Sequence, residues 1–162
     1  MTVLVLGVGN SLNGDDGIGP YVATRVAVAC PAGGEGAGGK FGPRAVIALD
    51  CGTTPENYTA VVRREKPDVL VIVDAAPMGL APGEIRVIPP ERIDLLTLST
   101  HSIPLSLFIT YLTDLASVVK LVGVQPVQML FGQPLSAVVE KAGEALVTLL
   151  CEGRLDEVRL LE

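Results

Sequence analysis

Short apolar runs rich in β-branched residues recur along this chain and alternate with segments of helical spacing. The most continuous run is VLVIVD at residues 69–74, and TVLVLGV at residues 2–8 and AVIALD at residues 45–50 are of the same kind. Apolar runs without polar alternation are typical of strands buried on both faces of a parallel sheet. Because parallel strands need crossover connections, usually helices, the chain is expected to adopt an α/β fold.

Two further strands are expected at residues 83–88 and 118–124, and Pro89-Pro90 ends the first of them. Apolar residues at helical spacing predict helices between the strands and after the last one. These helices are expected at residues 19–30, 54–64, 102–117 and 135–151. The alternation predicts one three-layer domain, in which a mainly parallel, twisted, five-stranded sheet carries helices on both faces.

The expected domain spans residues 1–162, a length typical of one globular domain. Residues 31–43, PAGGEGAGGKFGP, are so rich in glycine that they predict a surface loop. The charged segment at residues 154–162 is expected to be a peripheral tail. No long exposed apolar edge is evident from the sequence, so a monomer is expected.

The net charge of −6 and the pI near 4.8 disfavour nucleic acid as a partner, because nonspecific binding to phosphates requires lysine and arginine. No apolar run reaches the roughly 18 residues of a spanning helix, and no basic leader precedes the first strand, so membrane insertion is not expected and the protein is placed in the cytoplasm. The three cysteines are widely spaced, which favours reduced thiols.

Acidic residues follow three of the expected strands. Asp15 and Asp16 come after the first strand, Asp50 ends the second, and Asp74 ends the third. Ligands of open α/β sheets bind beyond the carboxyl ends of the strands, so these side chains are expected to converge on one edge. Each also has a structural explanation: Asp15 or Asp16 could cap the following helix, and Asp74 could accept hydrogen bonds from loop N–H groups.

His101 is the only histidine of the chain. Together with Asp16 and Asp74 it would provide two carboxylates and an imidazole, a ligand set that suits zinc, nickel or a similar divalent ion. A lone histidine near the start of a helix can equally be a hydrogen-bonded structural residue. Cys51 with His101 could form a thiolate and its base, although a buried structural thiol is the simpler interpretation of Cys51.

Several segments, in the same order, resemble the nickel-iron hydrogenase maturation endopeptidases, especially those that serve formate-hydrogenlyase type hydrogenases. The resemblance extends over nearly the whole chain. It is carried by VLGVGNSLNGDDGIGP at residues 5–20, DCGTTPEN at 50–57, IVDAAPMGLAPGEIRVI at 72–88, THSIPLSLFITYL at 100–112 and GVQPV at 123–127.

The resemblance implies that Asp16, Asp74 and His101 are the metal-binding and catalytic residues. It also implies that the metal is nickel supplied by the hydrogenase large-subunit precursor, with no permanently bound cofactor, and that the enzyme cuts off the C-terminal extension of that precursor. Asp50 and Gly52 match a further block near the expected cleft and are candidate substrate contacts.

Asn10 and Asp15 are two further candidate contacts in the loop after the first strand. We hypothesise a metal-assisted hydrolysis in which nickel orients the scissile bond and a carboxylate serves as base, with Asp15 one candidate. Two alternatives use the same fold: a metal-sensing chaperone that binds the precursor without cutting it, and a hydrolase resembling peptidyl-tRNA hydrolase. The acidic balance of the chain disfavours the second, because its substrate is linked to RNA.

Overall fold

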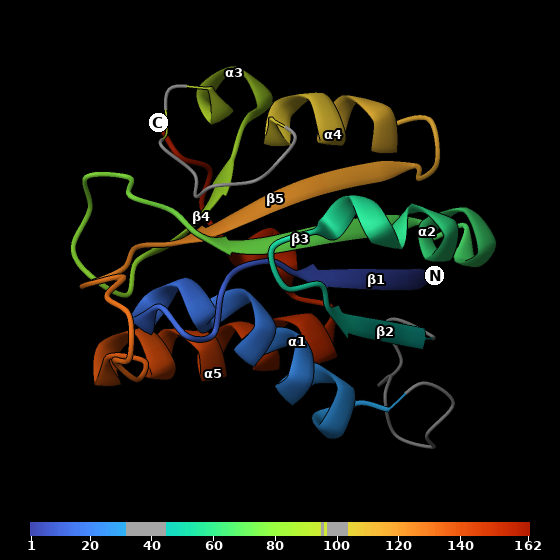
Figure 1. Cartoon of the computed structure of the whole chain (residues 1–162). Helices are drawn as coiled ribbons and strands as arrows, with labels where there is room; N and C mark the ends of the chain where they lie inside the picture. The colour runs from blue at the N-terminus through green and yellow to red at the C-terminus, as the bar shows by residue number, and fades with distance from the viewer. Residues whose placement is uncertain (32–44, 95, 97–103) are drawn as a thin grey trace.

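The computed structural model describes residues 1–31, 45–94, 96 and 104–162 (Figure 1). Most of the predicted loop at residues 31–43, and His101, lie outside the described residues.

Five strands form one sheet in the order β2-β1-β3-β5-β4. The strands are β1 (Thr2–Gly7), β2 (Ala45–Asp50), β3 (Val69–Ala75), β4 (Ile85–Ile88) and β5 (Val118–Val124). All neighbours pair in parallel except β4, which lies antiparallel to β5 at one edge. The prediction of a mainly parallel five-stranded sheet is confirmed.

Helices cover both faces of the sheet, as predicted. In Figure 1, α1 and α5 lie on one face, and α2 and α4 lie on the other. The α-helices are α1 (Ile18–Ala29), α2 (Thr59–Glu65), α3 (Pro90–Ile93), α4 (Leu105–Leu112) and α5 (Ala137–Glu152). Short 3-10 helices are η1 (Gly14–Gly17), η2 (Pro55–Tyr58) and η3 (Leu155–Glu157).

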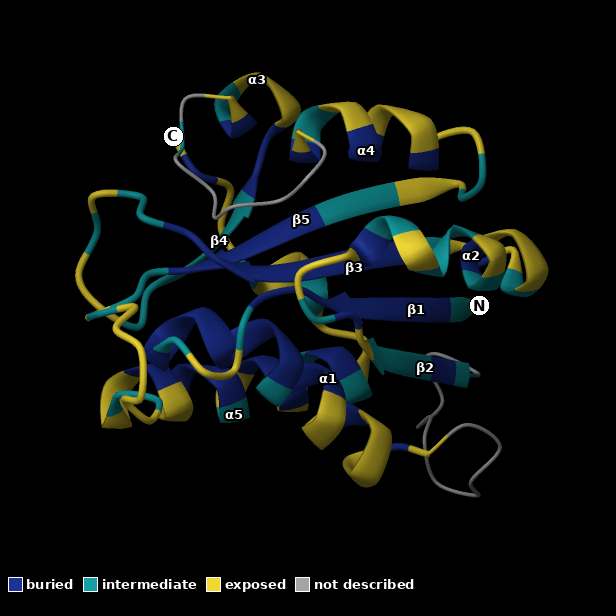
Figure 2. Cartoon of the chain, viewed as in Figure 1, coloured by how far each residue is buried: buried dark blue, intermediate teal, exposed yellow. Residues whose placement is uncertain are grey.

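The interior strand β1 shows how one apolar run contributes to two cores. Val3 and Val5 join the apolar cluster that includes α1 and α5, whereas Leu4 and Leu6 join the cluster that includes α2 and α4. Successive side chains of a strand point to opposite faces, so a continuous apolar run is what a strand between two helix layers requires. Figure 2 shows β1 and β3 as the buried centre of the sheet.

Some helices differ from the predicted ranges. The predicted helix at 54–64 begins with the 3-10 turn η2, and the predicted helix at 102–117 ends at Leu112 in α4. The Thr113 hydroxyl donates a 2.6 Å hydrogen bond to the Thr110 carbonyl oxygen, the kind of local side-chain contact that competes with helix continuation. The helix α3 was not predicted, because Pro90 not only stops a strand but also suits the first turn of a helix.

The C-terminal segment lies at the sheet edge formed by β4. The Val87 N–H donates to the Arg159 carbonyl oxygen at 2.8 Å, and the Leu161 N–H donates to the Val87 carbonyl oxygen at 2.8 Å. Leu161 is buried in the cluster beside α3 and α4. This segment therefore covers backbone groups that an open sheet edge would expose.

The expectation of reduced thiols is wrong for two of the three cysteines. Cys30 and Cys151 form a disulfide with a Cα–Cα distance of 5.9 Å, and Cys51 is free and buried. Cys30 directly follows α1, and Cys151 lies in the last turn of α5. The bridge joins residues 121 positions apart because α1 and α5 pack against each other, and no local spacing signals such a pair.

Gly19 sets the close packing of α1 on the ends of β1 and β3. A Cβ atom at this position would lie 2.2 Å from the Val8 carbonyl oxygen and 2.4 Å from the Val73 carbonyl oxygen. Both neighbours are backbone atoms, which cannot move aside like a flexible side chain. Only glycine allows the start of α1 to lie so close to the sheet.

We expect Gly19→Ala to lower the free energy of unfolding by about 3 kcal/mol, because the added methyl group overpacks the contact between α1 and the sheet. Urea denaturation followed by circular dichroism measures the effect. Gly143→Ala in α5 is the matched control, since a Cβ there would meet movable side-chain atoms of Ile18 and Tyr21. The control should change stability by less than about 1 kcal/mol. Equal losses in the two variants would contradict the assigned role of Gly19.

Candidate active site

Three buried acidic side chains lie towards the carboxyl-terminal edge of the parallel strands. Asp15 and Asp74 are 0% exposed and Asp16 is 5% exposed. Asp74 is the next-to-last residue of β3. Asp15 and Asp16 belong to η1, which packs against β3. Burial of a carboxylate is costly unless hydrogen bonds or a cation compensate, so each of these side chains requires an explanation.

The pairing of β1 with both of its neighbours brings the acidic segments together. Gly7 is in register with Asp50 of β2 and with Val73 of β3. Beyond the strand, the Val8 N–H donates to the Val73 carbonyl oxygen at 2.9 Å, and the Gly9 N–H donates to the Gly52 carbonyl oxygen at 2.8 Å. The loop that carries Asp15 and Asp16 therefore starts between the ends of β2 and β3.

Gly9 allows this loop to fold back onto itself. Its φ of +143° lies in a region that favours glycine, and a Cβ atom would lie 1.9 Å from the Asp16 carbonyl oxygen. The Asn10 N–H donates a 3.0 Å hydrogen bond to Asp16 Oδ2. The loop thus holds the Asp16 carboxylate next to the end of β1.

The second carboxylate oxygen of Asp16 has a different environment. Asp16 Oδ1 is buried and has no hydrogen-bond partner among the described residues. Buried polar atoms of native proteins are nearly always paired, and an exception often marks a position for an ion, a ligand or a water molecule. The donor chemistry and the burial of Asp16 Oδ1 fit a metal ligand.

Asp15 contrasts with its neighbour, because both of its carboxylate oxygens accept hydrogen bonds. Asp15 Oδ1 accepts from the Ser136 N–H at 2.7 Å. Asp15 Oδ2 accepts from the Val127 N–H at 2.8 Å, the Gln128 N–H at 3.1 Å and the Ser136 hydroxyl at 2.9 Å. These bonds attach η1 to the connection between β5 and α5, which is the hydrogen-bonding role that the sequence leaves open for Asp15.

The other candidate contacts lie at the same edge. Asn10 Oδ1 accepts from the Leu12 N–H at 2.9 Å, and Asp50 Oδ1 accepts from the Gly52 N–H at 2.9 Å, so both side chains stabilise local turns. Gly52 has φ of +53°, which favours glycine. Asp50 also lines a cavity of about 260 Å³ between the η1 loop and α1. The residues around this cavity are Ser11, Gly14, Gly17, Pro20, Tyr21, Thr24, Asp50 and Leu135.

The third residue of the predicted metal-binding trio, His101, lies outside the described residues. Within residues 1–31, 45–94, 96 and 104–162, no group of three or more His, Cys, Asp or Glu side chains is placed to hold a metal ion. The structure therefore brings Asp16 and Asp74 to the same edge, and the position of His101 relative to them stays a prediction.

Cys51 is a poor candidate for a nucleophile. Its side chain is 2% exposed, and burial, together with the nearby negative charge of Asp50, raises the pKa of the thiol to about 12. The Cys51 N–H donates to the Gly7 carbonyl oxygen at 2.8 Å, which fixes the residue at the end of the β1–β2 pair. A thiol with this pKa is neutral near pH 7, and catalysis by cysteine requires the thiolate.

Gln125 is a residue at this edge that the sequence did not single out. Its Oε1 accepts from the Met78 N–H at 2.6 Å and from the Leu80 N–H at 3.3 Å. These bonds hold the loop that follows Asp74 and β3. A polar residue directly after the predicted strand at 118–124 was the available signal, because the carboxyl ends of parallel strands lie at one edge.

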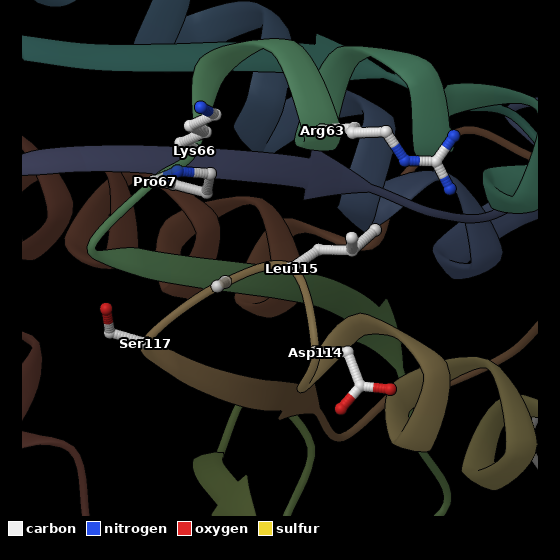
Figure 3. Close-up of a pocket in the computed structure, with 7 residues that line it drawn as sticks. Arg63, Lys66, Pro67, Asp114, Leu115 and Ser117 are labelled. Atoms are coloured by element: carbon white, nitrogen blue, oxygen red, sulfur yellow. The ribbon is translucent and has the colours of Figure 1, made fainter.

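A larger cavity, of about 440 Å³, opens at the other ends of the parallel strands (Figure 3). Lys66 and Pro67 precede β3 and Ser117 precedes β5, so this cavity lies at the amino-terminal ends of the strands. Figure 3 shows Arg63 and Lys66 on one side of it and Asp114 on the other. It contains none of the buried acids and is separate from the candidate active site.

Comparison with known proteins identifies the class to which this chain belongs. Residues 39–153 match the sequence model of a family described as HycI, hydrogenase maturation protease. The chain belongs to the hydrogenase maturation protease family and is an endopeptidase. This membership favours cleavage over the two alternatives, the chaperone and the peptidyl-tRNA hydrolase-like enzyme.

Individual relatives agree with the family match. The chain is 37% identical to the hydrogenase 3 maturation protease of Escherichia coli K12 over 147 residues, which are 90% of this chain and 86% of that protein. A crystal structure of a hydrogenase 3 maturation protease matches with a TM-score of 0.83 at 34% identity, covering 100% of this chain and 97% of the other. The solution structure of the endopeptidase HycI from Escherichia coli matches with a TM-score of 0.80 at 35% identity and the same coverage.

The helices in the described part of the chain include none whose length and apolar character would suffice to span a membrane.

The different environments of Asp15 and Asp16 predict different effects on stability. Asp15→Asn places an NH₂ group among four donors and should lower the free energy of unfolding by about 3 kcal/mol. Asp16→Asn can retain its one bond to the Asn10 N–H and removes a buried charge, so its effect should stay within about 1 kcal/mol. Urea denaturation at pH 7 compares the two isosteric changes. A comparable loss in both would show that Asp16 is also needed for folding.

Cys51 should react with iodoacetamide far more slowly in the folded protein than in urea. A rise of the pKa from 9.0 to about 12 lowers the thiolate fraction at pH 8 by about a thousandfold. Because the pKa is raised, the native rate should keep increasing as the pH passes 9, whereas the rate in urea should level off. Mass spectrometry without reductant measures the modification of Cys51 alone, since Cys30 and Cys151 are bonded. Fast native labelling that levels off below pH 9 would contradict a buried neutral thiol.

Proposed function

We propose that this endopeptidase removes the C-terminal extension from the large-subunit precursor of a nickel-iron hydrogenase, and that it recognises nickel already bound in the precursor. The relative at 37% identity is named a hydrogenase 3 maturation protease, which supports a hydrogenase as the target. The observation that carries the nickel proposal is the buried Asp16 Oδ1, which has no hydrogen-bond partner among the described residues.

In this proposal Asp16, Asp74 and His101 bind the nickel of the precursor. Asp16 and Asp74 come from different segments, yet both reach the carboxyl-terminal edge of the sheet, where ligands of α/β proteins bind. Three ligands from the enzyme leave other coordination positions to the precursor and to water, as at catalytic zinc sites. The metal enters with the substrate, so the enzyme needs no permanently bound cofactor.

The division of roles at the site follows from hydrogen bonding. Both oxygens of Asp15 already accept bonds from the connection between β5 and α5, so Asp15 is better suited to hold the site than to take up a proton. Asp16 Oδ2 accepts from the Asn10 N–H and Asp16 Oδ1 is assigned to the metal, so the role of base that activates water falls to Asp74. When bound, the nickel of the precursor would polarise the scissile carbonyl group or lower the pKa of the attacking water.

Asp50, Gly52 and Asn10 are proposed to contact the precursor chain near the cut bond. Asp50 lines the cavity of about 260 Å³ beside η1, and its side chain is exposed. The N–H groups of Asn10 and Gly52 already donate to Asp16 and Asp50, and their carbonyl oxygens each accept one N–H bond. A carbonyl oxygen has two lone pairs, so each of these oxygens can accept a further bond from an extended peptide.

We place the enzyme in the cytoplasm as a monomer. Structural disulfides are rare in a reducing compartment such as the cytoplasm. The oxidation state of the Cys30–Cys151 pair in cells therefore tests the proposed location. Mass spectrometry of rapidly alkylated cells distinguishes the reduced form from the bonded form.

The nickel proposal predicts that only the loaded precursor is cut. Purified protein is incubated with nickel-loaded precursor and with metal-free precursor, and loss of the C-terminal extension is followed by mass spectrometry. We expect cleavage of the loaded form and an intact metal-free form. Cleavage of both forms at similar rates would contradict nickel recognition, and cleavage of neither would contradict the proposed substrate.

Variants connect this reaction to the named residues. Asp16→Asn, Asp74→Asn and His101→Ala should each reduce the rate of processing by at least about a hundredfold, the scale of losses when a group that acts in the transition state is removed. Asp114→Asn is the matched control at the opposite edge and should retain full activity. Thermal denaturation of each variant shows whether a loss of activity reflects unfolding.

A further inference from the structure

The connection between β5 and α5 is uncharged and exposes apolar side chains. Residues 125–136, QPVQMLFGQPLS, contain no Asp, Glu, Lys or Arg. Figure 2 shows much of this connection as exposed. With a neighbouring leucine of the η1 loop, its exposed apolar side chains form a surface that we call the apolar rim. The apolar rim consists of Leu12 (63% exposed), Val127 (54%), Met129 (38%), Leu130 (61%) and Phe131 (79%).

Hydrogen bonds hold the apolar rim in place. The Gly132 N–H donates to the Leu12 carbonyl oxygen at 2.8 Å, which joins the two segments of the rim. Within the connection, Gln128 Oε1 accepts from the Leu130 N–H at 2.8 Å, and Gln128 Nε2 donates to the Pro134 carbonyl oxygen at 3.1 Å. Asp15 also accepts hydrogen bonds from Val127, Gln128 and Ser136 of the connection. The exposure of Leu130 and Phe131 is therefore a property of a fixed backbone.

A fixed loop that keeps several large apolar side chains in water gains nothing in stability from them. Scattered apolar residues are normal on protein surfaces, but a contiguous group marks an interaction site. Preorganisation lowers the entropy lost when such a group binds a partner. These properties fit a surface that binds an apolar partner.

The location of the apolar rim identifies the partner. Leu12 lies four positions before Asp16, and the Val127 N–H is 2.8 Å from Asp15 Oδ2, so the rim adjoins the loop that carries the candidate active site. An extended chain advances by about 3.3 Å per residue, so a peptide that leaves the site reaches the rim within a few residues. The absence of charge in residues 125–136 favours an uncharged stretch of that peptide.

We propose that the apolar rim binds apolar side chains of the precursor's C-terminal extension, beside the bond that is cut. This proposal rests on the proposed function and names the surface that holds the part to be removed. Contacts made equally in the bound substrate and in the transition state change KM and leave kcat unaltered. The rim is therefore a binding surface and takes no part in the chemical step.

The variant that tests the rim carries Leu130→Ser and Phe131→Ser. We expect it to raise KM for the nickel-loaded precursor at least about tenfold, with kcat within about twofold of the wild-type value. Its melting temperature should equal that of the wild type, because both side chains are exposed. Leu160→Ser is the matched control, with a leucine that is 58% exposed at the β4 edge, and its KM should be unchanged.

A double-mutant cycle identifies the bound segment. Replacing the apolar residues of the precursor's extension with serine should raise KM for the wild-type enzyme, but it should raise KM little further for the rim variant. Fully additive effects of the two changes would overturn the assignment of the extension to the rim.

A measurement on the wild-type enzyme does not depend on how any variant folds. Hydrogen exchange of the backbone amides of residues 127–133 should slow when the nickel-loaded precursor binds to the wild-type enzyme at low temperature. Unchanged exchange there, or an unchanged KM in the rim variant with normal cleavage by the wild type, overturns the rim proposal alone. Absence of cleavage by the wild type contradicts the proposed function and the rim proposal together.

Discussion

Parallel pairing on both sides of β1 is the constraint on which the rest of the structure depends. Because β1 lies between β2 and β3, Gly7 is in register with both Asp50 and Val73, and three polypeptide segments reach one edge together. Gly19 then allows α1 to close against the same ends, and Gly9 allows the η1 loop to turn back. The site is thus a consequence of backbone geometry before any polar side chain is placed.

Adjacent aspartates at this edge have opposite environments, and the proposed function assigns stability to one and nickel binding to the other. Asp15 is satisfied by donors from the β5–α5 connection and fastens the last strand and the last helix to η1. Asp16 keeps one buried oxygen without a partner among the described residues. A protein tolerates such a cost where function requires it, provided that neighbouring contacts stabilise the fold. Under the proposed function, the dense hydrogen bonding of Asp15 stabilises the loop in which Asp16 keeps an oxygen for the metal.

The sequence predicts this fold well where periodicity carries the information. Continuous apolar runs predict β1, β2 and β3, and the alternation of strands and helices predicts the shared edge at which Asp16 and Asp74 lie. Two features depend on contacts between distant segments and have no local signal: the Cys30–Cys151 bond and the four donors to Asp15. Residue types in the sequence indicate which chemistry is available. Whether an aspartate is a ligand or a structural residue depends on its hydrogen-bond partners, which only the fold determines.

The two proposals together give a physical account of product release. The precursor would be held at two places, through its nickel at Asp16, Asp74 and His101 and through its extension at the apolar rim, and the scissile bond would lie between them. Two linked contacts bind more tightly than either one alone, because the second forms at a high effective concentration. Cleavage cuts the link, so each product retains only one contact and dissociates more readily than the intact precursor. The bond that the enzyme hydrolyses is thus the link that lets the precursor bind at both places, and its loss lowers the affinity for the products.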